Sequence, residues 1–132
     1  MARFPRLEVK PDHDHNTVVV EEGDVFSEYV EQALGTRKVA TVDWSVKGGL
    51  PQGQVSLYKV LTDDGKEYYI ITNSDLTSDV VVTIADNVYE AVQSAKTEFL
   101  SFANKYLTPE EKEEQVKEIN RLFDELLSKA PA

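Results

Sequence analysis

Two helical stripes, separated by a three-residue break, constrain the fold of this chain more than any other feature of its sequence. In the last third of the chain, apolar residues recur at alternating steps of three and four on both sides of the break. This spacing keeps one side of a helix apolar and leaves the other side in water. Within the break, Thr108 and Glu111 form the pattern of a capping box, and Pro109 occupies the favoured first helical position. The sequence therefore predicts a helical hairpin over residues 86–130, with Asp86 as the cap of its first helix.

The seam of this hairpin is wider than a helix pair alone would need. Tyr89 and Leu100 flank the first stripe, and Leu122 and Leu127 flank the second. A widened stripe indicates that each helix touches two surfaces, one of which is the neighbouring helix. The second surface is either a sheet of the same chain, which is the simpler answer, or another copy of the chain, since symmetric dimers are the commonest oligomers.

The middle of the chain has the pattern of an antiparallel meander. In residues 38–46 the even positions are apolar and the odd positions, Asp43 among them, are polar, so one face of this strand is expected to be buried. We expect a glycine-rich loop over residues 47–53, further strands over 55–62 and 67–72, and a tight turn between them at Gly65. Residues 80–84 fit either a strand or a backward extension of the first helix, and their β-branched composition favours a strand.

The N-terminal part of the chain predicts two short strands and a short helix. Residues 6–10 alternate in polarity and residues 18–20 are three valines, so both segments fit strands. Asp24 is a suitable N-cap for a helix over residues 24–34. These elements predict one α+β domain over residues 1–132: a sheet-rich part, 4–84, with an antiparallel β-meander of about four to five strands, packed by the short helix and the C-terminal helical hairpin.

Charge and composition limit the classes of partner. Asp and Glu number 24 against 14 Lys and Arg, giving a net charge of −10, which opposes direct binding to nucleic acid and to anionic membranes. The chain has no cysteine, which excludes disulfides and thiolate chemistry, and it has no apolar run long enough to span a membrane. A cytoplasmic protein without a cofactor is expected from this composition.

The only two histidines, His13 and His15, lie in one acidic segment with Asp12 and Asp14. In an extended backbone both imidazoles point the same way, and two imidazoles with a carboxylate can hold zinc or nickel. A catalytic zinc site usually takes a third ligand from elsewhere in the fold, and no distant histidine is available. A solvated loop is therefore the simpler interpretation, with a metal site at His13, His15, Asp12 and Asp14 as the alternative.

Four aromatic residues of the expected strands could line a ligand pocket: Trp44, Tyr58, Tyr68 and Tyr69. Tyrosine is also an ordinary strand residue. Because Tyr68 and Tyr69 are adjacent in the sequence, their side chains must point to opposite faces of the sheet. This indicates that both faces of that strand are used.

Three functions follow, in decreasing order of support. No motif fixes a chemistry, so the first is a non-enzymatic acidic interaction module (an adaptor, regulator or inhibitor) that acts by contact with another protein or with itself as a homodimer. The second is a small-molecule binding domain near Trp44 and the strand tyrosines. The third is a metal-dependent enzyme that uses His13 and His15.

Overall fold

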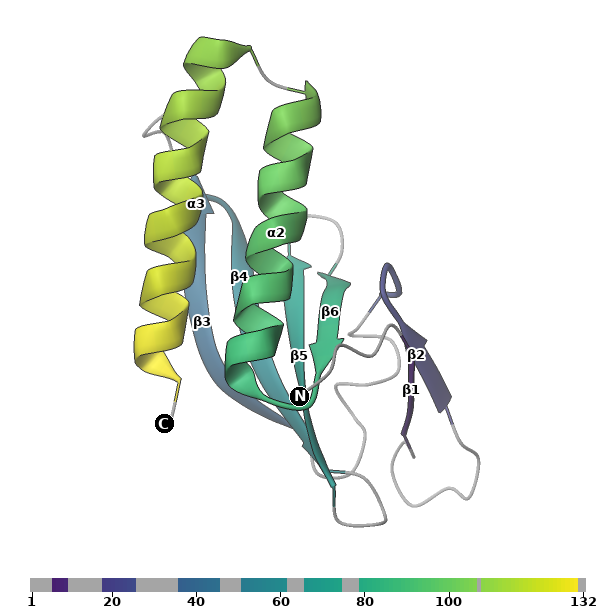
Figure 1. The fold of residues 1–132 in the computed structure, drawn as a ribbon. Helices are drawn as coiled ribbons and strands as arrows, with labels where there is room; N and C mark the ends of the chain where they lie inside the picture. Colours follow the sequence, from purple (N-terminus) through teal and green to yellow (C-terminus); the bar gives the residue numbers. More distant parts are fainter. Residues whose placement is uncertain are drawn as a thin grey trace.

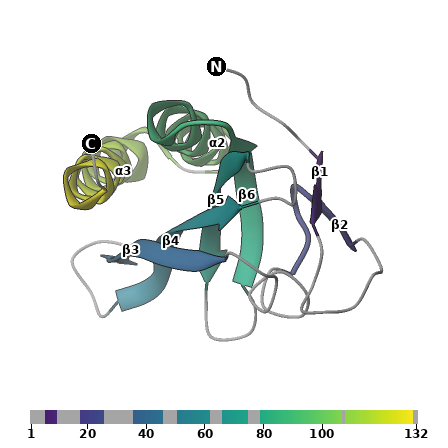
Figure 2. The same cartoon turned by 90° about the horizontal axis from the view of Figure 1, so that it is seen from below.

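The structure is a computed structural model, and it describes residues 6–9, 18–25, 36–45, 51–61, 66–74, 79–106 and 108–130. A four-stranded antiparallel sheet carries two long helices on one face, and a two-stranded hairpin lies beyond its β6 edge (Figures 1 and 2). The predicted α+β class, the meander and the helical hairpin are confirmed. None of the helices in the described residues is long and apolar enough to cross a membrane.

The four strands of the large sheet follow one another along the chain and pair in that order. They are β3 (Arg37–Ser45), β4 (Pro51–Leu61), β5 (Glu67–Ser74) and β6 (Asp79–Ala85). The predicted alternation in the first of them is confirmed, since Ala40 and Val42 are buried and Asp43 is exposed. The segment that fitted either strand or helix is the strand β6, which pairs with β5.

Two strand boundaries differ from the sequence prediction by more than one residue, and the end of the glycine-rich loop moves furthest. β4 begins at Pro51, so residues 51–53, expected in the loop, pair with the end of β3. Proline is tolerated as the first residue of a strand because it has no N–H to contribute. β5 continues through Asn73 and Ser74, which pair with Val80 and Asp79. Their polar side chains suggested the end of the strand, but pairing with β6 supplies hydrogen-bond partners for their backbone groups, so the strand continues.

The two helices are α2 (Val88–Tyr106) and α3 (Pro109–Lys129). The prediction that Asp86 caps the first helix is wrong. The side-chain oxygen of Asn87 accepts a hydrogen bond from the Glu90 amide at 2.8 Å, so asparagine, an equally good cap, takes that role one residue later. At α3 the predicted capping box between Thr108 and Glu111 is confirmed in both directions, with Pro109 in the first turn.

The helices and the sheet enclose the main hydrophobic core. The rings of Phe99 and Phe123 meet edge to face across the hairpin with their centroids 5.1 Å apart. Phe123 is buried, and Ile71 in β5 and Val42 in β3 lie in the same cluster. Each helix therefore touches the other helix and the sheet, which is the simpler of the two answers that the wide stripes allowed.

The opposite face of the sheet has a smaller core beneath a separate hairpin. The strands β1 (Arg6–Val9) and β2 (Val18–Glu21) pair only with each other, and Val20 of β2 packs with Tyr58 and Ile70. After β2, Gly23 adopts a φ of 94°, a value that side chains disfavour, and the chain turns to run along β6. The Asp24 carboxylate accepts from the Glu21 amide in this turn, and Val25 forms a bridge with Val80, so the expected helix does not begin at these two residues. The rest of that expected helix, residues 26–34, lies outside the described residues.

Candidate functional site

The proposed metal site lies outside the part of the chain that the structure describes. His13, His15, Asp12 and Asp14 all fall between β1 and β2, in residues 10–17. Within the described residues, His, Cys, Asp and Glu form no group of three that could hold a metal ion. The metal site thus remains a sequence prediction, and it carries none of the functional argument below.

The strand tyrosines do not gather in one place. Tyr58 and Tyr68 belong to the small core on the hairpin side of the sheet, whereas Tyr69 packs against the helix-side core. The expected use of both faces of β5 is therefore confirmed, but a single pocket cannot be lined by all three rings. Trp44 lies in β3 opposite Gly53, and its side chain is outside the described part of the structure.

Buried hydroxyl groups are the unusual polar feature of the sheet interior. Ser56 is buried and its hydroxyl lies 3.0 Å from that of Thr41 on the neighbouring strand. Thr72 and Thr83 are fully buried, and the described structure gives their hydroxyl oxygens no hydrogen-bond partner. A buried hydroxyl without a partner lowers the stability of the folded state, so Thr72 and Thr83 are sites where substitution can change the free energy of unfolding. They are not candidates for a catalytic site, because the buried polar residues of the described structure include no charged side chain.

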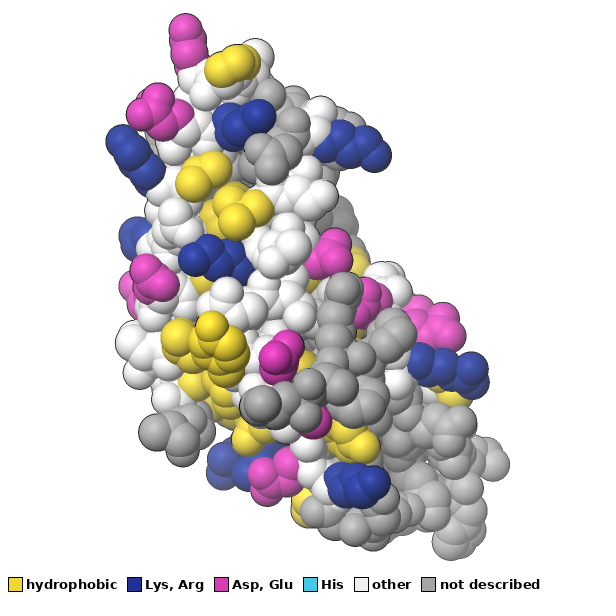
Figure 3. Space-filling model, in the orientation of Figure 1, with side chains coloured by type: hydrophobic (Ala, Val, Ile, Leu, Met, Phe, Trp, Pro, Cys, Tyr) yellow, Lys and Arg dark blue, Asp and Glu magenta, His cyan; other side chains and the backbone are white. Residues whose placement is uncertain are grey.

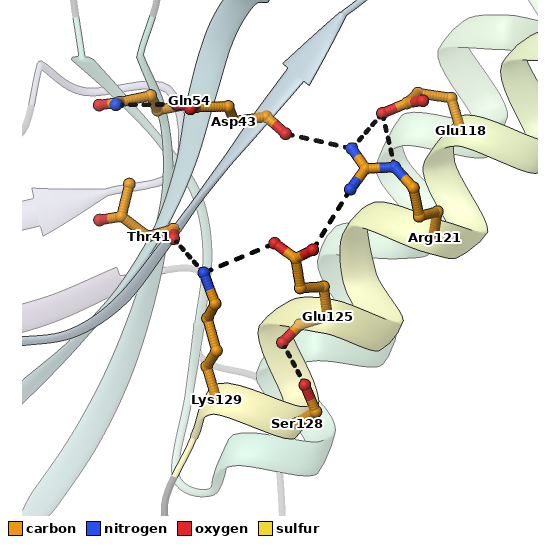
Figure 4. Close-up of polar contacts among 8 residues, drawn as sticks. All are labelled: Thr41, Asp43, Gln54, Glu118, Arg121, Glu125, Ser128 and Lys129. Atoms are coloured by element: carbon orange, nitrogen blue, oxygen red, sulfur yellow. Dashed lines mark hydrogen bonds and ion pairs between the residues drawn. The ribbon is translucent and has the colours of Figure 1, made fainter.

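A polar cluster joins α3 to the edge strand β3 (Figure 4). The Arg121 guanidinium donates to the Asp43 carbonyl at 3.2 Å, and the Lys129 ammonium donates to the Thr41 carbonyl at 3.4 Å. Glu118 and Glu125 orient these cations: Arg121 pairs with both, and Lys129 pairs with Glu125 at 3.5 Å. The cluster is exposed, so its ion pairs contribute little stability, but it places two cations on backbone oxygens of the sheet edge.

Of this cluster, the sequence pattern singled out only Asp43, and Arg121 was not predicted to take part. The signal was present, because glutamates stand three residues before it and four residues after it on the same helix. The hydrogen bond that Arg121 donates to the Glu118 carboxylate raises the pKa of Arg121, partial burial opposes this, and attraction to Glu118 and Glu125 adds to it. Because the pKa of Arg121 is raised in the folded chain, the stability that its interactions contribute is fully present at every pH below the pKa of the unfolded chain. The guanidinium therefore stays charged at every physiological pH.

The helical hairpin divides into two halves with different surroundings. We call residues 88–95 and 119–129 the inner half and residues 96–106 and 109–118 the outer half. The helix residues that the structure describes as buried all lie in the inner half: Ala91, Val92, Ala95, Ile119, Leu122, Phe123 and Leu126. In the outer half, no residue whose burial is described is fully buried. The outer half extends past the strands in Figure 1, and hydrophobic side chains reach the surface over the helices in Figure 3.

The outer half is nevertheless apolar in sequence. Phe99, Leu100 and Val116 are half-buried there, and Phe102 and Tyr106 continue the stripe along the chain.

Comparison of the chain with family models, with curated proteins and with solved structures gives no match. The geometry of the chain itself is thus the basis for a functional proposal. The outer half of the hairpin combines an apolar stripe in the sequence with no fully buried side chain among the residues whose burial is described.

Proposed function

We propose that this chain is a non-enzymatic interaction module that assembles as a homodimer through the outer half of its helical hairpin. One observation carries the proposal: the apolar stripe continues along residues 96–106, while the sheet that would bury it does not. Phe99 and Leu100 pack against the edge of the helix-side core, yet both remain half-buried, as does Val116. Covering these side chains removes apolar area from water, which is the main driving force for association.

The charges of the outer half favour a second copy as the partner. The described charged residues of α2 in this half are Lys96, Glu98 and Lys105, which sum to +1. Those of α3 sum to −3, because five glutamates outnumber two lysines: Glu110, Glu111, Glu113, Glu114, Glu118, Lys112 and Lys117. In the two-fold arrangement that we propose, α2 of one copy lies against α3 of the other. The positive segment of α2 then faces the negative segment of α3 at two symmetric places. The result is a four-helix bundle, a stable way to bury two amphipathic hairpins.

The mass of the protein in solution, measured by light scattering during size-exclusion chromatography, tests this proposal. The unaltered chain is expected at twice its 14.9 kDa mass, and Val116→Glu is expected to return it to the monomer, because a carboxylate cannot be buried unpaired in the seam. Leu127→Glu is the matched control, since it introduces the same carboxylate in the inner half of the same helix, at a residue that is 37% exposed. A monomer for the unaltered chain at all concentrations, or dissociation by both variants alike, would contradict the proposal.

A further inference from the structure

The outer edge of β3 is the longest exposed sheet edge in the described structure. β3 is nine residues long and pairs on one side only, with β4. An antiparallel strand directs the N–H and C=O of one residue to the same side, and alternate residues to opposite sides. Thr41 and Asp43 are two residues apart and both their carbonyls meet cations of α3, so these two residues form the outward set. Their N–H groups face the same way.

The other edge of the sheet is closed by main chain. Along β6, Gly23 donates to the Val81 carbonyl at 2.7 Å, Val81 donates to the Asp24 carbonyl at 2.9 Å, and Val25 bridges Val80. The β3 edge is instead covered by two flexible side chains, which occupy its carbonyls. Side chains can leave without unfolding a strand. The two edges are thus protected in different ways, one permanently and one reversibly.

We propose that the outer edge of β3 is a latent strand-pairing surface that Arg121 and Lys129 keep closed, and that β3 of a second copy is the strand that fits it. The usable stretch is short, since the register shifts between Lys38 and Ala40 and again between Trp44 and Ser45. Exposed Arg37 and Lys38 discourage pairing before this stretch, as charged residues do on natural sheet edges.

Within residues 40–44, a two-fold axis through Val42 gives the most favourable register. It places Thr41 of each copy opposite Asp43 of the other, so the outward N–H and C=O groups of both residues pair. Asp43 then lies opposite a threonine and not opposite the other copy's Asp43, which avoids placing two carboxylates together. This contact is separate from the outer half of the hairpin, so the inference stands independently of the proposed dimer.

The test is the double variant Arg121→Ala/Lys129→Ala, made in the unaltered chain and in Val116→Glu. The matched control is Lys112→Ala/Lys117→Ala, which removes the same charge from the same helix at residues that make no hydrogen bond or ion pair with β3 in the described structure. In Val116→Glu the mass is expected to double relative to the parent. The unaltered dimer carries two β3 edges, so there the mass is expected to rise to at least twice that of the parent. In both backgrounds hydrogen exchange of the Thr41 and Asp43 amides is expected to slow. The control is expected to change neither quantity.

Adding Thr41→Pro to the double variant checks the mechanism, because proline removes an outward N–H that no neighbouring strand of the monomer uses. It is expected to restore the parent mass. A double variant that melts cooperatively, keeps the parent mass and leaves exchange at Thr41 and Asp43 unchanged would overturn the proposal. If the double variant fails to fold, the single variants Arg121→Gln and Lys129→Gln replace it, with partial slowing of the same two amides expected, and unchanged exchange in both would overturn the proposal.

Discussion

The inner and outer halves of the helical hairpin share one sequence pattern and have opposite surroundings. Steps of three and four place apolar residues along the whole of both stripes, yet Leu122 and Phe123 are buried whereas Leu100 and Val116 are half-buried. The difference comes from the sheet, whose strands cover only the inner half (Figure 1). Periodicity therefore reports which side of a helix avoids water, and only the tertiary structure shows whether that side has been covered within the chain.

The largest expected effect that tests this contrast is the loss of a buried ring from the inner half. Phe123→Ala is expected to lower the free energy of unfolding by about 3–5 kcal/mol, because it leaves a cavity between both helices and the sheet. Phe99→Ala removes the other ring of the pair but is expected to cost less, since Phe99 is only half-buried. Urea unfolding at fixed protein concentration measures both values.

Lys117→Ala, at an exposed residue of α3, is the control for this pair and is expected to stay within about 0.5 kcal/mol of the parent. If Phe99→Ala costs as much as Phe123→Ala in a monomeric background, the two halves are equally buried and the contrast between them is wrong.

A smaller effect is expected from replacing Thr83, whose buried hydroxyl lies beneath the helices and has no partner in the described structure. Thr83 lies opposite Ile71, which belongs to the helix-side core, so its side chain is on that face of the sheet. Thr83→Val keeps the shape and removes a buried oxygen that has no partner in the described structure, and it is expected to raise the free energy of unfolding by about 1–2 kcal/mol. Thermal and urea unfolding of the variant check this, and a clear loss of stability would mean that the hydroxyl is hydrogen-bonded in solution.

The smallest effect is expected at the tip of the outer half. Thr108→Ala removes the side-chain acceptor of the capping box and is expected to cost about 1 kcal/mol. Because the outer half contributes no fully buried side chain among its described residues, the loss is expected to appear mainly as fraying of the first turns of α3. Hydrogen exchange of residues 110–113 would show it, and Thr108→Ser, which keeps the acceptor, is the variant that should retain the protection.

The sequence predicted the parts of the fold that rest on local patterns. The alternation in β3 placed Val42 inside and Asp43 outside, and the capping box located the start of α3 at Pro109. The choice of a strand for residues 80–84 was also correct, because a β-branched run fits a pleated surface better than a helix. These features depend on residues that are close in sequence.

The features that could not be predicted depend on contacts between distant residues. Nothing near Arg121 indicates that it reaches the Asp43 carbonyl, 78 positions away. Tyr58 and Tyr69 lie on different faces of the sheet, which could be predicted only with the register of β4 and β5 in hand. The packing of Val20 on the second face could be predicted only if the position of the β1–β2 hairpin were known. For the candidate site, the sequence identified the apolar hairpin seam but not which half of it the sheet leaves uncovered.

The contact between α3 and β3 has a consequence for folding. The strands of the meander each pair with a neighbour in sequence, so most of the sheet forms through short loops. Lys129 and Thr41 are 88 positions apart, which makes the closure of α3 over β3 the contact of highest sequence separation in this cluster and the one with the largest entropic cost. During synthesis, β3 emerges long before the helix that shields it, and its backbone is open to neighbouring nascent chains throughout that interval.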